Sequence, residues 1–122
     1  MNDDDTRLWH VTVTVAGRSH DQAQVRDAMD RLRDEHAFLH SLRYGSDRAE
    51  LCYWEQAPEM LDAAAMAMRV WLEHRESAGL PQWEIVGLEV LERDMFLRRG
   101  EDTPGRRRSD AVGLTTPTPV PF

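Results

Sequence analysis

Residues 34–45 read "DEHAFLHSLRYG", and the point at which a helix gives way to a strand within them decides the fold. His36 and His40 are four residues apart, so a continuous helix would place both imidazoles on one face, where they could share a metal ion. From about residue 37, however, apolar residues recur with the period of two that is typical of a strand. Four strand steps would hold the two histidines roughly 13 Å apart, too far for one ion. We therefore predict no metal site here.

A β-hairpin over about residues 37–55 follows from this assignment. Gly45, Ser46 and Asp47 supply turn chemistry between its two strands. In the second strand, Leu51 and Tyr53 alternate with Cys52 and Trp54, and both pairs are suited to burial. The pattern therefore leaves open which side of this strand faces the core.

The segment before the hairpin contains a strand and a helix. The alternation in "LWHVTVTVAG", residues 8–17, predicts a half-buried strand that ends at a glycine. A helix then begins at "SHDQ", residues 19–22, where Ser19 as N-cap and Gln22 three residues later fit a capping box. Val25, Met29 and Leu32 form its apolar stripe.

The segment after the hairpin repeats this order as a helix followed by a strand. Pro58 suits the first turn of a helix within residues 57–81, and Gly79 suits the position just beyond its C-terminus. Leu61, Ala65, Met68 and Leu72 recur at helical spacing and are the expected core stripe of this helix. Alternation in "WEIVGLEVLERD", residues 83–94, predicts the last strand.

The resulting order is β-α-β-β-α-β, which predicts a ferredoxin-like α+β sandwich. Right-handed crossovers place two helices on one face of a four-stranded antiparallel sheet with strand order 4-1-3-2. We assign residues 8–97 to this domain and residues 1–7 to a flexible N-terminus. Residues 98–122 are rich in proline and arginine, lack sustained periodicity and are expected to form a tail without a core of its own.

Composition narrows the class of protein. The chain has 122 residues, enough for one domain, and a net charge of -7. Residues 1–97 contain 10 arginines against 19 acidic residues, so binding of nucleic acid is not expected. A single cysteine, Cys52, favours the reducing cytoplasm, and no apolar run is long enough to span a membrane. We find no cofactor-binding motif and expect no cofactor.

The open face of the predicted sheet, opposite the helices, carries one weak candidate site. His10 and Thr12 of the first strand, with His40 and Trp54 of the hairpin, could line a ligand pocket there. A solvated sheet face is the alternative reading of the same four residues. No catalytic residue is assigned.

The helix near residues 58–77 is apolar nearly all round, which is typical of a helix covered on two sides. Its outer face is expected to carry the following residues: Ala63, Met66, Ala67, Val70 and Trp71. We predict that these residues form an interface with a second copy, making a homodimer, or with a partner protein. The tail is expected either to dock on its own domain, on a dimer mate or on a partner, or to remain disordered. The alternative is a run of helix-favouring alanines with tolerated exposed apolar residues.

The leading hypothesis for function is a small cytoplasmic, non-catalytic protein that acts through association, as a homodimer or an adaptor. The alternative is a small dimeric enzyme of the α/β-barrel type, resembling cofactor-free monooxygenases and related lyases. Such an enzyme would hold its substrate in a pocket on the open sheet face. The presence or absence of that pocket distinguishes the two hypotheses.

Overall fold

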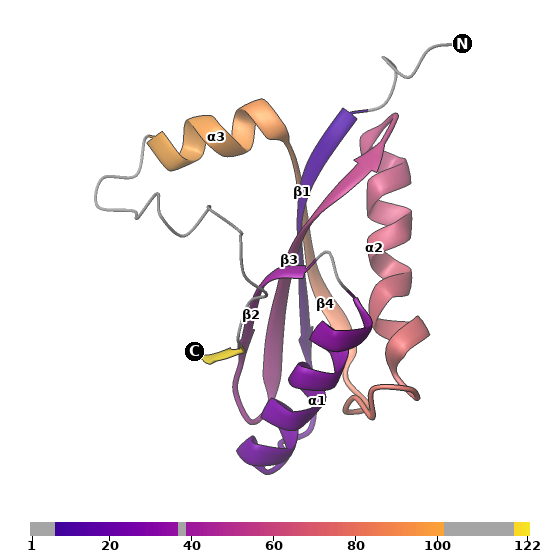
Figure 1. Ribbon diagram of the computed structural model, residues 1–122, viewed down its shortest axis with the longest axis vertical. Helices are drawn as coiled ribbons and strands as arrows, with labels where there is room; N and C mark the ends of the chain where they lie inside the picture. Colours follow the sequence, from indigo (N-terminus) through magenta and orange to yellow (C-terminus); the bar gives the residue numbers. More distant parts are fainter. Residues whose placement is uncertain (1–6, 37–38, 102–118) are drawn as a thin grey trace.

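The computed structural model describes residues 7–36, 39–101 and 119–122 (Figure 1). Within these residues the fold is α+β, with a five-stranded mixed sheet and three helices. The elements in chain order are β1 (Arg7–Ala16), α1 (Gln22–Glu35), β2 (Leu39–Tyr44), β3 (Arg48–Ala57), α2 (Met60–His74), β4 (Glu84–Glu92), α3 (Arg93–Glu101) and β5 (Val120–Pro121). None of the helices in these ranges is long and apolar enough to cross a membrane.

The sheet has the strand order β4-β1-β3-β2-β5. Its first four strands are antiparallel to their neighbours and follow the order predicted from the sequence. The prediction of a four-stranded, wholly antiparallel sheet is not confirmed, because β5 pairs with β2 in parallel. The C-terminal end thus lies on its own domain, where the Phe122 amide donates to the Tyr44 carbonyl at 2.9 Å.

The helix-to-strand transition lies between His36 and Leu39, as the alternation predicted. α1 ends at Glu35, and His36 already has the extended dihedral angles φ -120° and ψ 91°. His40 lies in β2, so the hairpin assignment is confirmed. The predicted capping box is wrong: α1 begins at Gln22 after Asp21, and no side chain caps its first turn.

α2 ends at His74, earlier than predicted, and the turn that follows it contains the predicted glycine motif. Gly79 has a φ of 64°, a conformation that disfavours residues with a Cβ atom. The Leu80 amide donates to the Arg75 carbonyl at 2.8 Å and the Gly79 amide donates to that of Glu76 at 3.2 Å. These are the two hydrogen bonds of a Schellman motif, which turns the chain toward β4.

The core lies between the sheet and the helices α1 and α2, which cover one face (Figure 1). Val11, Val13 and Val15 of β1 are fully buried at its centre. In β3, Leu51 and Tyr53 face this core, whereas Trp54 lies on the other face beside His10; this settles the orientation that the sequence left open.

The predicted orientation of α2 is wrong. Its core face consists of Ala63, Ala67, Val70 and Trp71, whereas the expected core stripe of Leu61, Ala65, Met68 and Leu72 is exposed. The physical reason is that the alanines allow the helix to approach the sheet closely, while Trp71 brings the largest apolar area into the core. The Trp71 indole also donates to the Trp83 carbonyl at 3.2 Å and stacks on the Trp83 ring.

α3 lies on the opposite face of the sheet from α1 and α2 (Figure 1). The sequence did not predict this helix, and the proposed boundary between residues 97 and 98 falls inside it. Residues 1–6, 37–38 and 102–118 lie outside the described ranges. They include most of the predicted N-terminal segment and most of the predicted tail.

Candidate functional site

The four residues predicted to bind a ligand are brought together on the sheet face opposite α1 and α2. His10 of β1 is paired with Trp54 of β3, and their rings are 5.0 Å apart. His40 reaches across from β2, so that its Nε2 atom lies 3.0 Å from Nε2 of His10. The Thr12 hydroxyl lies 3.5 Å from the Cys52 sulfur.

A side chain from α3 covers this cluster. The Phe96 ring stacks on His10 with a centroid distance of 4.0 Å and meets Trp54 edge-on at 5.1 Å. His10 is consequently only 5% exposed, although it lies on the face that was expected to be open. An ion pair between Arg99 of α3 and Glu89 of β4, at 3.0 Å, holds the same helix to the sheet.

The side chains of this cluster pack against one another, and their protonation states suit such packing. In a hydrogen bond between two imidazole nitrogens one donates and the other accepts, so the His10–His40 contact requires at least one neutral ring. Burial lowers the pKa of His40 and thereby favours its neutral form. Burial also raises the pKa of the Cys52 thiol, which keeps this sulfur protonated and a poor nucleophile.

The residues predicted to form an interface do not lie on one exposed face. Ala63, Ala67 and Trp71 have no exposed area, and Val70 is buried against the core. Only Met66 of the predicted set is exposed. Side chains within the core cannot contact a second copy, so four of the five predicted interface residues are not available for such a contact.

α2 does expose an apolar surface, on the side predicted to be its core. Together with the exposed apolar side chains of the edge strand β4, against which α2 packs, it makes one candidate surface. We name it the α2–β4 surface, and its large apolar residues are Met60, Leu61, Met68, Leu72, Val86 and Leu88. The largest exposed fractions are 78% for Leu61 and 62% for Val86. A register shift opposite Thr14 and Val15 accompanies the outward position of Val86.

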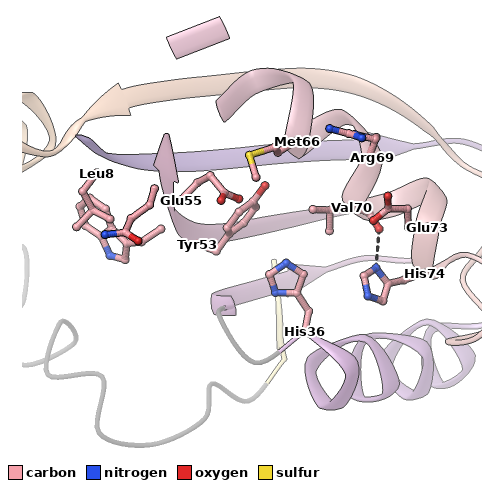
Figure 2. A pocket seen from close by; sticks show the side chains of 11 residues that line it. Leu8, His36, Tyr53, Glu55, Met66, Arg69, Val70, Glu73 and His74 are labelled. Carbon is pink, nitrogen blue, oxygen red and sulfur yellow. Dashed lines mark hydrogen bonds between the residues drawn. The ribbon is translucent and has the colours of Figure 1, made fainter. Parts of the chain in front are cut away.

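A cavity lies on the opposite side of α2, between that helix and the C-terminal end of α1 (Figure 2). Its volume is about 550 Å³, and its floor is β3. Apolar atoms from Leu8, Met66 and Val70 line it together with the Tyr53 ring. In Figure 2, His36 and His74 project toward its end nearest α1, and Arg69 and Glu73 project from α2.

Two groups in the cavity wall stand out by their hydrogen bonding. The Tyr53 hydroxyl is buried and has no partner among the described residues, and burial raises the pKa of this phenol. The His74 Nδ1 atom lies 2.9 Å from the Val70 carbonyl. Because a carbonyl only accepts, Nδ1 of His74 donates to it, and Nε2 is the ring nitrogen that takes no part in this hydrogen bond.

The electrostatics of the cavity are set by burial and by one neighbouring ring. Burial, with a smaller contribution from the nearby His74, lowers the pKa of His36, so this ring is neutral near pH 7. Burial raises the pKa of Glu55, whose carboxylate lies beside Tyr53 (Figure 2). Besides the two histidines, the ionisable side chains on the wall are the carboxyl groups of Glu55 and Glu73 and the guanidinium of Arg69.

The sequence did not predict this cavity. Its residues come from β1, β3, α2 and the end of α1, so no local spacing marks them. The only available signal was His36 at an element boundary. His36 and His40 contact different partners, since His36 packs near Tyr53 and His74 while His40 contacts His10. In the described part of the chain no group of three or more histidine, cysteine or acidic residues is arranged to hold a metal ion.

Comparison with known families assigns most of the chain to one family. The chain belongs to the family described as "Domain of unknown function (DUF8830)", whose model matches residues 8–107. This range covers the sheet from β1 to β4, the three helices and part of the segment that follows them. A comparison with curated proteins found no match to this chain.

Proposed function

We propose that the protein is a small non-catalytic module that acts through association, as a homodimer formed by the α2–β4 surface. The β-α-β-β-α-β unit from β1 to β4 is, in this proposal, a ferredoxin-like scaffold that presents the surface. The observation that carries the proposal is the exposure of six large apolar side chains on one helix and the neighbouring edge strand. Apolar patches of this kind on small proteins usually mark contact surfaces.

The geometry of α2 supports a contact on this side of the helix. Met66 and Glu73 line the cavity toward α1, so they mark one flank of α2. Met68 and Leu72 are separated from that flank by a wide turn about the helix axis and lie on the flank toward β4. In this proposal the exposed stripe and the edge strand act together as one surface.

β4 offers main-chain groups to the same contact. It lies at one edge of the sheet and pairs only with β1 among the described strands, so the N–H and C=O groups on its outer side have no strand partner. Unpaired strand edges readily accept a further strand. Two of its three acidic side chains are paired, Glu89 with Arg99 and Glu92 with Arg7, which reduces the repulsion between two copies of this strand.

A second copy is the occupant that fits best. A two-fold axis beside β4 would bring each apolar stripe onto the same stripe of the other copy, as isologous interfaces require. The six side chains expose on the order of 600 Å² per copy, close to the roughly 800 Å² that each partner buries in an interface of standard size. The alternative enzyme with a substrate pocket on the open sheet face is supported less well, because Phe96 occupies the space over His10.

The oligomeric state in solution tests the proposal. We expect the full-length protein to sediment as a dimer, and Leu61→Glu or Leu72→Glu to weaken the dimer at least tenfold while leaving the circular dichroism spectrum unchanged. Leu97→Glu is the matched control, since Leu97 on α3 is 51% exposed but lies off the surface. A wild-type monomer at about 100 μM, far above a typical Kd for a stable dimer, or equal effects of the Leu61 and Leu97 substitutions, would contradict the proposal.

The proposed compartment is the reducing cytoplasm. The described structure holds one free cysteine, Cys52, buried next to Thr12. A thiol in this position is protected from oxidation by burial, and it has no partner cysteine in the sequence. Fractionation of the native cells, with detection of the untagged protein by an antibody, checks this assignment, and the protein is expected in the cytoplasmic fraction.

A further inference from the structure

The cavity between α1 and α2 lies on the other flank of α2 from the α2–β4 surface, and nothing in the proposed association uses it (Figure 2). We propose that this cavity is a binding site for a small organic cation, an amine with an apolar body. The proposal stands independently of the dimer, because no residue is shared between the two surfaces.

The size and the apolar part of the wall suit a small molecule. Cavities that bind such ligands usually have volumes of about 300–1,000 Å³, and this one has about 550 Å³. Leu8, Met66 and Val70 supply aliphatic and thioether contacts, and the rings of Tyr53 and His36 lie 5.2 Å apart along one side. An apolar body, aromatic or aliphatic, can displace water from these surfaces.

The Tyr53 hydroxyl supplies the first polar requirement. A buried hydroxyl without a hydrogen bond costs free energy that phenylalanine at the same position would avoid. The hydroxyl points toward the cavity, beside Glu55 and below Met66, but it is fully buried, so a ligand becomes its partner once the Met66 side chain moves aside (Figure 2). A phenol can accept a hydrogen bond from an ammonium group as well as donate one.

The charges on the wall select the sign of the ligand. Glu55 and Glu73 form no ion pair within the described structure, and the one cationic side chain of the wall, Arg69, does not balance both. Burial of Glu55 without a cation beside it disfavours its ionised form, and an ammonium group would relieve that cost. An anion would meet two carboxylates in a protein whose net charge is already -7.

His74 adds a ring nitrogen to the wall. Its Nδ1 atom donates to the Val70 carbonyl, so Nε2 is the ring nitrogen that this hydrogen bond leaves for a ligand. The cavity thus combines a phenol, an imidazole and carboxylates around an apolar centre, a set in which the two carboxylates supply the acceptors for an amine.

Three probes that differ only in their polar group test this inference on the full-length protein. They are 2-phenylethylamine, which is a cation near pH 7, neutral 2-phenylethanol, and the 3-phenylpropanoate anion. Titration calorimetry gives the affinities, and amide chemical shifts locate the site. We expect the amine to bind at least tenfold more tightly than the alcohol, the anion to bind most weakly, and the shifts to centre on residues 53–56 and 66–74.

Single substitutions test whether the charge of Glu55, and not a change in folding, sets the preference for the amine. Glu55→Gln should reduce the preference for the amine over the alcohol at least fivefold, and Tyr53→Phe should weaken binding of both. Glu84→Gln, at an exposed acid of β4, should change neither, and thermal unfolding confirms that each variant is folded. The inference is overturned if the anion binds as tightly as the amine, if no probe shifts these residues at millimolar concentration, or if Glu84→Gln acts like Glu55→Gln.

Discussion

Replacement of Phe96 by alanine is the most direct measure of how firmly α3 is attached to the sheet. Phe96 is the one residue of α3 whose ring stacks on His10 and meets Trp54 edge-on. Aromatic pairs contribute about 0.5–1.5 kcal/mol each beyond the burial of area. Burying a phenylalanine side chain stabilises by roughly 1.5–3 kcal/mol, and Phe96 is only partly buried.

From these contributions we expect Phe96→Ala to lower the free energy of unfolding by about 2–3 kcal/mol. Urea unfolding of the full-length protein, followed by tryptophan fluorescence, measures this change, and Trp54 lies beside the altered site. Met95→Ala is the matched control: Met95 precedes Phe96 and is 53% exposed, so its loss should cost less than about 0.5 kcal/mol. Amide exchange at His10 should become faster only in the Phe96 variant.

The refuting result is specific. If Phe96→Ala and Met95→Ala change the free energy of unfolding by the same small amount, and the His10 amide keeps its protection in both, α3 is not packed on the sheet. The interpretation of the cluster around His10 as a covered contact would then be wrong.

Two further predictions concern histidine protonation and the C-terminal end. Burial lowers the pKa of His36 and of His40 in the folded state. Below about pH 6.5 the unfolded state therefore binds more protons than the folded state, and the free energy of unfolding should decrease as the pH is lowered from about 7.5 to about 5.5. The raised pKa of Glu55 changes stability with pH in the opposite direction, so the effect of the histidines is isolated by comparing the wild type with His40→Gln. The variant should lose less stability over this pH range than the wild type. Equal losses would contradict the role of His40. At the other end of the chain, the Phe122 ring lies 5.2 Å from the guanidinium carbon of Arg43 and 4.7 Å from that of Arg48. Phe122→Ala should remove about 1 kcal/mol of local stability. It should also accelerate hydrogen exchange of the amide at residue 122, which donates to the Tyr44 carbonyl. An unchanged exchange rate would mean that these ring contacts do not hold the C-terminal end in place.

Local patterns in the sequence determined the order of the first six elements and the limits of several of them. The alternation in β1 and the break in helical spacing after His36 are properties of a few consecutive residues, so they are visible without a structure. Gly79 is of the same kind, because the left-handed conformation at a helix end favours glycine wherever the helix lies in the fold. The proximity of His10, Trp54 and His40 followed from the strand order, which short connections and right-handed crossovers restrict.

Only the tertiary structure decided the orientation of α2 and the positions of α3 and β5. α2 carries apolar residues on two flanks, so its hydrophobic pattern permits two orientations, and the choice was made by the close approach of Ala63 and Ala67 and the burial of Trp71. α3 is a mostly polar helix anchored through Phe96, and β5 is a two-residue strand held by β2, so neither has a periodic pattern of its own. The cavity is likewise a property of the fold, since residues from four separate elements create it by failing to fill the space between α1 and α2. Such a gap depends on how whole elements pack, and no run of consecutive residues encodes it.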